Sequence, residues 1–208
     1  MATEPEHDSL EQVADEVRVC TRCELSRSRT HAVPGEGNPK ARVMLIGEGP
    51  GWHEDQQGKP FVGASGKFLT ELIGHAGLQR EDVFITNVVK CRPPGNRDPL
   101  PDEIEACSIY LDRQVKLIDP DVIVTLGRFS MSRYFPGERI SRIHGQAKEI
   151  GHRLVVPMYH PAAALHQGAL KATIIEDFEK LPRLLADREK AREAAREKGE
   201  SATQSSMF

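Results

Sequence analysis

Residues 43–51 read VMLIGEGPG, so four apolar side chains are followed at once by a turn rich in glycine. A short apolar run bounded by glycine and proline is typical of a strand buried on both faces of a parallel sheet. Three later runs have the same character, at residues 83–89, 122–126 and 154–158. These four runs therefore predict the strands of one central sheet.

The segments between the apolar runs have the length and pattern of helices, at residues 65–76, 101–117 and 129–135. Strands that alternate with helices predict an α/β fold, here a single-domain, three-layer sandwich around a central four-stranded, mostly parallel sheet. The length of 208 residues suits one domain. We expect an acidic N-terminal helix, a main domain, and a charged helix with a disordered tail, at residues 1–19, 20–181 and 182–208.

The composition excludes some classes of protein. The chain is 38% hydrophobic and 28% charged, and it has no apolar run of the roughly 20 residues that a membrane span needs. The N-terminal segment is too acidic for a signal peptide, so we expect a monomeric cytoplasmic protein without a membrane partner. Within residues 1–19, six acids stand against Arg18 alone, which accounts for the net charge of −3. The rest of the chain has a small positive balance, which permits nucleic-acid binding without requiring it.

The residues that follow the predicted strands form a candidate site. In open parallel sheets, ligands bind beyond the carboxyl ends of the strands. The turns and side chains at these ends are residues 47–51, Asn87, residues 127–128 and His160. We therefore expect these residues to meet in one crevice.

Four cysteines form a second candidate site. Cys20 and Cys23 have the short spacing of metal and redox sites, while Cys91 and Cys107 flank a loop rich in Arg, Pro and Gly. Four thiolates suit either a zinc ion or a [4Fe-4S] cluster, and ligand type alone does not separate the two. Buried structural cysteines are the alternative, because disulfides are disfavoured in the reducing cytosol.

Several short blocks occur in a fixed order between about residues 16 and 181. They are Cys20-x-x-Cys23, GEGPGWHED and KPFVG within residues 47–63, TNVVKCRPPGNRDPLPDE at 86–103, Cys107, VTLG at 124–127 and HPAA at 160–163. Together they resemble the family-four, iron-sulfur type of uracil-DNA glycosylase. The resemblance implies a monofunctional enzyme of base excision repair that hydrolyses the N-glycosidic bond of uracil in DNA and leaves an abasic site. It also implies a structural [4Fe-4S] cluster on the four cysteines.

Two positions depart from the family pattern. Gly49 stands where the family usually has Ala, and His144 lies in RISRIHGQ, where relatives often carry Arg before Gly. A uracil-trapping branch of the superfamily uses a His in a basic KRRIH insertion, but the matching region here, CRPPGNRDPLPDE, has no such His. We therefore expect ordinary turnover. The alternatives are a uracil-DNA-binding or covalently trapping relative without turnover, and a zinc-stabilised interaction module.

The pocket residues acquire expected roles from the chemistry of uracil excision. A flipped uracil needs a group that reads its Watson-Crick edge, and the Asn87 amide can accept from N3–H and donate to O4. Phe61 offers a ring face on which the base can stack. The backbone N–H groups of Gly47, Gly49 and Gly51 can bind uracil oxygens or a phosphate.

Hydrolysis is expected to depend on three side chains. His160 would donate a hydrogen bond to uracil O2 and stabilise the negative charge that develops on the leaving base. Glu48 is expected to orient the attacking water and to offset positive charge on the sugar, with Glu54 as the second candidate. We interpret Asp55 as a solvated loop acid and Lys90 as a structural or DNA-binding residue rather than a Schiff-base nucleophile.

The remaining expected contacts involve the DNA backbone and a protein partner. Leu165 is a candidate wedge that fills the gap left by the flipped nucleotide. The expected phosphate contacts are Arg92, Arg97, Arg128, Arg139, Arg142 and His144. The last five residues, Gln204–Phe208, resemble the short peptides that dock on bacterial sliding clamps, which makes a clamp a candidate partner.

Overall fold

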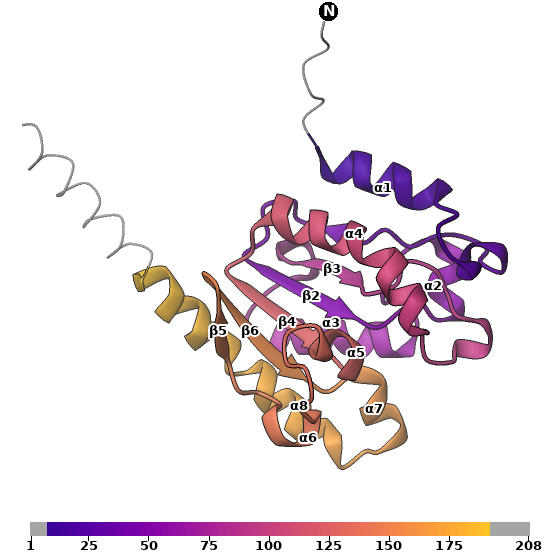
Figure 1. Ribbon diagram of the computed structural model, residues 1–208. Helices are drawn as coiled ribbons and strands as arrows, with labels where there is room; N and C mark the ends of the chain where they lie inside the picture. Colours follow the sequence, from indigo (N-terminus) through magenta and orange to yellow (C-terminus); the bar gives the residue numbers. More distant parts are fainter. Residues whose placement is uncertain (1–7, 192–208) are drawn as a thin grey trace, which may run out of the picture.

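The computed structural model describes residues 8–191, which form one sheet of six strands in the order β1-β3-β2-β4-β6-β5 (Figure 1). The four inner strands run parallel and are β2 (Val43–Gly47), β3 (Phe84–Asn87), β4 (Val122–Leu126) and β6 (Arg153–Met158). An antiparallel strand closes each edge, namely β1 (Glu36–Gly37) and β5 (Lys148–Ile150).

The predicted α/β class and single domain are confirmed, but the predicted count of four strands is wrong because the sheet is mixed and has six. The two strands that the sequence does not predict are β1 and β5, whose side chains are partly or fully exposed. Neither contains the apolar run that marks the inner strands. They join the sheet through backbone pairing with β3 and β6, which a hydrophobic pattern does not reveal.

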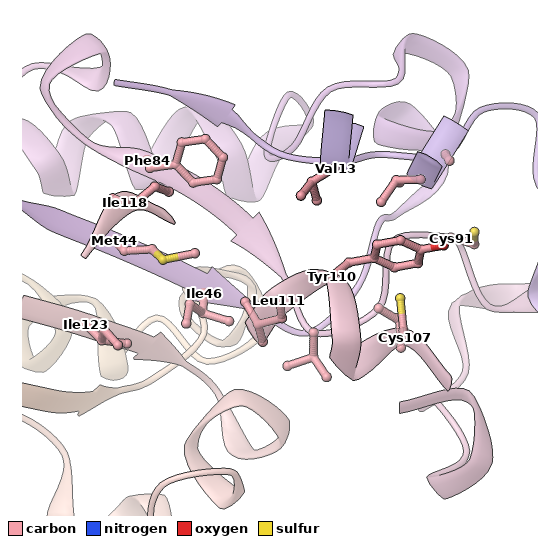
Figure 2. Close-up of a cluster of buried hydrophobic side chains, with 14 of the residues drawn as sticks. Val13, Met44, Ile46, Phe84, Cys91, Cys107, Tyr110, Leu111, Ile118 and Ile123 are labelled. Atoms are coloured by element: carbon pink, nitrogen blue, oxygen red, sulfur yellow. The ribbon is translucent and has the colours of Figure 1, made fainter. Parts of the chain in front are cut away.

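Helices cover both faces of the sheet (Figure 1). One face packs against α1 (Leu10–Val19), α4 (Pro101–Ile118) and α5 (Arg128–Ser132), and the other against α3 (Ala64–His75), α7 (Pro161–His166) and α8 (Leu170–Phe178). Neighbouring residues of β4 point to opposite faces, so Ile123 packs on the α4 side and Val124 on the α3 side. Figure 2 shows part of the α4-side core, with Met44, Leu111 and Ile123 close together.

The main helices lie close to their predicted positions, whereas some short ones are not predicted. The Ser9 hydroxyl accepts a hydrogen bond from the Gln12 backbone N–H at 3.1 Å and caps α1 as expected. The helix predicted at residues 129–135 is shorter and ends at Ser132. The remaining elements are α2 (Trp52–Gln57), α6 (Ile140–Ile143), 3₁₀ turns at Glu24–Arg27, Arg80–Asp82 and Pro94–Asn96, and a helical stretch at residues 181–191.

Two parts of the sequence predictions fall beyond this region. Residues 1–7 of the predicted acidic helix, and the end of the predicted tail with its clamp-like peptide Gln204–Phe208, lie outside the described residues. Between residues 8 and 191, no helix combines the length and the apolar character of a membrane span.

Candidate active site

A cleft of about 460 Å³ lies at the carboxyl ends of the inner strands. The predicted site residues that line it are Glu48, Gly49, Gly51, Glu54, Phe61, Asn87, Arg97 and His160. Pro50, Ser65, Pro93, Asn96, Ala162, Ala163 and His166 complete the lining. The fold therefore brings the predicted base-binding and hydrolytic side chains together, as expected for the carboxyl edge of a parallel sheet.

Asn87, the last residue of β3, is 1% exposed, and its Oδ1 atom has no hydrogen-bond partner within residues 8–191. Gly47, the last residue of β2, lies directly beside it in the sheet register. A Cβ atom at residue 47 would lie 2.3 Å from that Oδ1 and 2.6 Å from the Phe61 ring, so only glycine fits there. A buried amide oxygen without a partner is costly, and a ligand N–H would satisfy it.

Phe61 forms another wall of the cleft in a backbone conformation that is rare for a bulky residue, with φ of 51°. Its ring stacks on that of His160, with centroids 5.6 Å apart and an angle of 26° between the planes. A Cβ atom at Gly66 in α3 would lie only 1.9 Å from the Phe61 carbonyl oxygen. Gly66 is thus needed for this turn, and the sequence analysis did not identify it.

His160 precedes α7 and caps it. Its Nδ1 atom accepts a hydrogen bond from the Ala162 backbone N–H at 3.1 Å, which assigns the ring proton to Nε2. Burial lowers the pKa of His160 to about 4, because protein surrounds the ring even though part of its surface faces the cleft. The side chain is therefore a neutral imidazole that can donate one hydrogen bond from Nε2.

The two predicted catalytic acids differ in their surroundings. Glu54 is 8% exposed and accepts hydrogen bonds from three backbone N–H groups, those of Gly51 at 3.1 Å and of Val62 and Gly63 at 2.9 Å each. Glu48 is half-buried in the cleft wall, and this burial raises the pKa of its carboxyl. Glu54 thus holds two turns together, whereas Glu48 keeps a carboxylate available in the cleft.

Asp55 does not match its interpretation as a solvated loop acid. It is 2% exposed, and its Oδ1 atom accepts a hydrogen bond from the Thr30 backbone N–H at 2.8 Å. The reason is that GPGWHED, which reads as a turn, continues into α2 and turns both acids inward. Gly51 begins this helix, with the Glu54 carboxylate bonded back to its backbone N–H.

The predicted DNA-contact residues are more scattered. Leu165 lies on α7 and is 52% exposed. Arg97 makes a bidentate ion pair with the buried Glu103, at 2.9 and 2.7 Å. Arg128, the first residue of α5, forms an ion pair with Asp98.

Of the predicted DNA-contact residues, Arg97 lines the cleft, whereas Leu165, Arg92, Arg128, Arg139, Arg142 and His144 do not. Arg92 donates to the Asn96 side chain at 2.7 Å, and Arg142 is exposed in α6. His144 lies away from the cleft, because its Nδ1 atom is 2.7 Å from the buried carboxylate of Asp177 in α8. His144 is therefore engaged with the protein core rather than aimed at a base pocket.

The four cysteines line one small cavity at the end of the α4-side core, and none is in a disulfide. Figure 2 shows Cys91 and Cys107 there beside Tyr110. Three N–H groups point at sulfur atoms: Arg29 Nη1 lies 3.0 Å from Cys91 Sγ, Lys90 N 3.3 Å from Cys107 Sγ, and Arg22 N 3.5 Å from Cys20 Sγ. Within residues 8–191, no three His, Cys, Asp or Glu side chains are grouped closely enough to hold one metal ion.

Lys90 connects this cavity to the base pocket. Its side chain is 1% exposed, and its Nζ atom donates to Thr86 Oγ1 at 2.5 Å, Gln114 Oε1 at 2.7 Å and the Asn87 carbonyl oxygen at 2.8 Å. A lysine so enclosed cannot attack a sugar in the cleft. The only signal for this role in the sequence is a lysine that directly continues an apolar run, VFITNVVK.

Comparisons with known proteins agree with this arrangement. The model of the uracil DNA glycosylase superfamily matches residues 34–180. The chain is 53% identical over 190 residues to a Type-4 uracil-DNA glycosylase from Sulfurisphaera tokodaii, which covers 85% of each chain. It is 51% identical to that of Saccharolobus solfataricus, covering 87% of this chain and 88% of the relative, and 46% identical to that of Archaeoglobus fulgidus, covering 85% and 94%.

Proposed function

The chain belongs to the uracil DNA glycosylase superfamily, and from this membership we propose how its cleft recognises uracil and breaks the glycosidic bond. The protein is a uracil-DNA glycosylase of DNA repair, a monofunctional hydrolase that releases free uracil from DNA and leaves an abasic site. The unpartnered Oδ1 atom of Asn87 at the base of the cleft is the observation that carries the proposed mode of recognition.

Base recognition begins when the deoxyuridine leaves the helical stack and enters the cleft. Asn87 Oδ1 then accepts a hydrogen bond from uracil N3–H, while its amide group donates to O4. Cytosine presents an acceptor at N3 and a donor at its amino group, so both Asn87 groups would be left unpaired. Each unpaired group costs roughly 1 to 3 kcal/mol, which is enough to exclude the normal base.

Bond cleavage requires stabilisation of the uracil anion as it leaves. The base stacks on Phe61, and the Nε2–H group of His160 donates to uracil O2. Because the Ala162 N–H group fixes the imidazole orientation, this donor is already aligned before charge develops on the base. A neutral imidazole binds the uncharged uracil of the substrate less strongly than it binds the uracil anion that forms in the transition state. This difference is what lowers the barrier.

Glu48 acts on the sugar side of the bond. Its carboxylate orients the attacking water and offsets the positive charge that builds on the oxocarbenium-like sugar. Glu54 contributes indirectly as a positioning residue, since its oxygens bind backbone groups on two turns of the cleft wall. Leu165 fills the place of the flipped nucleotide, and Arg97, Arg92, Arg128 and Arg142 supply positive charge along the DNA backbone.

Cys20, Cys23, Cys91 and Cys107 would hold a [4Fe-4S] cluster. Four thiols around one cavity, with three N–H groups directed at their sulfur atoms, fit the ligand set of such a cluster. The choice of a [4Fe-4S] cluster over a zinc ion rests on the resemblance to the iron-sulfur type of uracil-DNA glycosylase, because four thiolates suit both groups. Through these cysteines the cluster would connect the end of α1, the loop after β3 and helix α4, and its role would be structural.

The test of this function is incubation of the purified protein with a labelled oligonucleotide that contains one deoxyuridine, followed by alkali cleavage. We expect cleavage at uracil with repeated turnover, a strong loss in both Asn87→Ala and His160→Ala, and brown, iron-containing protein. A DNA adduct that resists SDS would instead indicate the trapping relative, and trapping by borohydride would indicate lyase chemistry. Colourless, inactive protein would favour the zinc-stabilised module.

The enzyme is proposed to act as a monomer and to reach a sliding clamp through Gln204–Phe208. The support is the sequence of that peptide, with two apolar residues at the chain end. Deletion of residues 204–208 is expected to abolish clamp pull-down and to leave excision from a free oligonucleotide unchanged. Pull-down that persists after the deletion would refute this assignment.

A further inference from the structure

Trp52, the only tryptophan in the chain, is exposed and is the sequence neighbour of a residue that lines the cleft. It is the first residue of α2 and directly follows Gly51, which lines the cleft, yet its side chain is 52% exposed. Among the large apolar side chains of residues 8–191, Leu165 on α7 is equally exposed, and it directly precedes the cleft-lining His166. Each of these exposed apolar residues is thus the sequence neighbour of a residue that lines the cleft, one on α2 and the other on α7.

The helix that carries Trp52 is held firmly in place. The buried carboxylate of Glu54 binds the backbone of Gly51 and Gly63, and the buried carboxylate of Asp55 binds the backbone of Thr30. The bonds to Gly63 and Thr30 tie α2 to two other segments, while the bond to Gly51 stays within the start of the helix. The backbone that carries Trp52 is thus held in place, which lowers the entropic cost of using this residue in binding.

The indole also keeps a free face. The rings of Trp52 and His53 lie 5.0 Å apart at an angle of 84°, which is a T-shaped contact. In such a contact the edge of one ring meets the face of the other, so His53 covers at most one face of the indole, and 52% of the Trp52 side chain remains exposed. An open, rigid aromatic face beside a nucleotide cleft is the device by which proteins stack unpaired bases.

We propose that Trp52 forms a second base subsite, which stacks the nucleobase adjacent to the flipped uracil in the same strand. The inference rests on the proposed function and adds to it a contact outside the uracil pocket. Because every nucleobase has an aromatic face, the subsite accepts any neighbouring base. Its contribution is greatest on single-stranded DNA, where the neighbouring base is not already stacked in a duplex.

Binding is measured through the fluorescence of the protein, since Trp52 is its sole tryptophan. The probe is a short single strand that carries a 2′-fluorinated deoxyuridine, whose glycosidic bond resists hydrolysis. We expect the fluorescence of Trp52 to change on binding, and the change to shrink when an abasic residue replaces one of the two flanking nucleotides. Unchanged fluorescence on saturation with this probe would overturn the proposal.

A substitution series separates stacking from a loss of structure. With affinity measured by anisotropy of a labelled probe, Trp52→Ala is expected to bind about ten-fold more weakly and Trp52→Phe to keep most of the affinity. The difference between wild type and Trp52→Ala should vanish on the probe that lacks the flanking base. A loss of the same size on every probe would refute a base contact, because misfolding would act on all of them alike.

The test of the Trp52 base contact and the test of glycosylase activity can fail independently of each other. Release of uracil by the wild-type protein from an ordinary deoxyuridine strand establishes the proposed function whatever the Trp52 variants do. Absence of release from folded wild-type protein would count against the function itself.

Discussion

The side-chain nitrogen of Lys90 lies 2.8 Å from the backbone carbonyl oxygen of Asn87. Lys90, in the loop after β3, thus supports the end of that strand. The backbone N–H of the same lysine lies 3.3 Å from the sulfur of Cys107. One residue therefore bonds both to the strand end that carries Asn87 and to a sulfur of the cysteine cavity.

Replacement of Lys90 by methionine should destabilise the fold. The variant leaves the buried oxygens of Thr86, Asn87 and Gln114 without the donor that they share, which is expected to lower the free energy of unfolding by about 3 kcal/mol. Denaturant unfolding of the two proteins measures this difference. The exposed Lys67→Met in α3 is the matched control and should change stability little. Equal midpoints for Lys90→Met and wild type would contradict the buried network.

Asn87→Ala should reduce uracil excision by about a hundred-fold, because two hydrogen bonds of roughly 1 to 3 kcal/mol each are lost from the pocket. The measurement is single-turnover excision from a single-stranded oligonucleotide. Asn38→Ala, after β1, removes a partly buried asparagine outside the cleft and should excise uracil at the wild-type rate. Comparable rates for all three proteins would show that Asn87 does not read the base.

Substitution of Glu54 is expected to lower stability, whereas substitution of Glu48 is expected to slow catalysis. Glu54→Gln leaves one oxygen for three backbone N–H groups, so we expect a loss of about 2 kcal/mol in unfolding free energy. Glu48→Gln should unfold like wild type but hydrolyse the bond more slowly at saturating enzyme. Thermal unfolding and single-turnover rates, measured on both variants, distinguish the two roles. The reverse pattern would make Glu54 the group that positions water.

His160 should make folding depend on pH. Since burial lowers its pKa from 6.5 to about 4 in the folded state, the unfolded chain binds a proton in this window that the folded protein does not. Stability that is present above pH 6.5 is therefore lost as the pH falls toward 4, by on the order of 1.4 kcal/mol per pH unit.

Urea unfolding at several pH values between 4 and 7 measures this dependence. His160→Gln should show a shallower dependence than wild type. If His160→Gln and wild type have equal slopes, the imidazole is not kept neutral by burial.

The inner part of the fold could be predicted because each inner strand carries its own signal. Val122–Leu126 is rich in Val, Ile and Leu with Thr125 as its one polar residue, and a short run of this kind is typical of a strand buried on both faces of a sheet. Lys148–Ile150 has no such run and becomes a strand only because β6 offers backbone partners. The signal that makes this segment a strand therefore lies in the neighbouring strand β6 and not in residues 148–150 themselves.

The same distinction applies to the site. Asn87 and His160 could be predicted because they lie at or just beyond the carboxyl ends of strands, and these ends meet at one edge of the sheet. The positioning role of Glu54 depends on the N–H groups of Val62 and Gly63, which belong to another turn. Gly66 could not be assigned a role either, since its need for a small side chain arises from contact with Phe61 in three dimensions.

The short strands at the two sheet edges have a consequence for self-association. An exposed edge is a template on which a second chain can add a strand, and long flat edges lead to aggregation. Here β1 offers two residues and β5 three. A second copy would find too few backbone groups to form a continuous ladder, so the sheet resists fibril-like growth and a concentrated solution of the enzyme should stay dispersed.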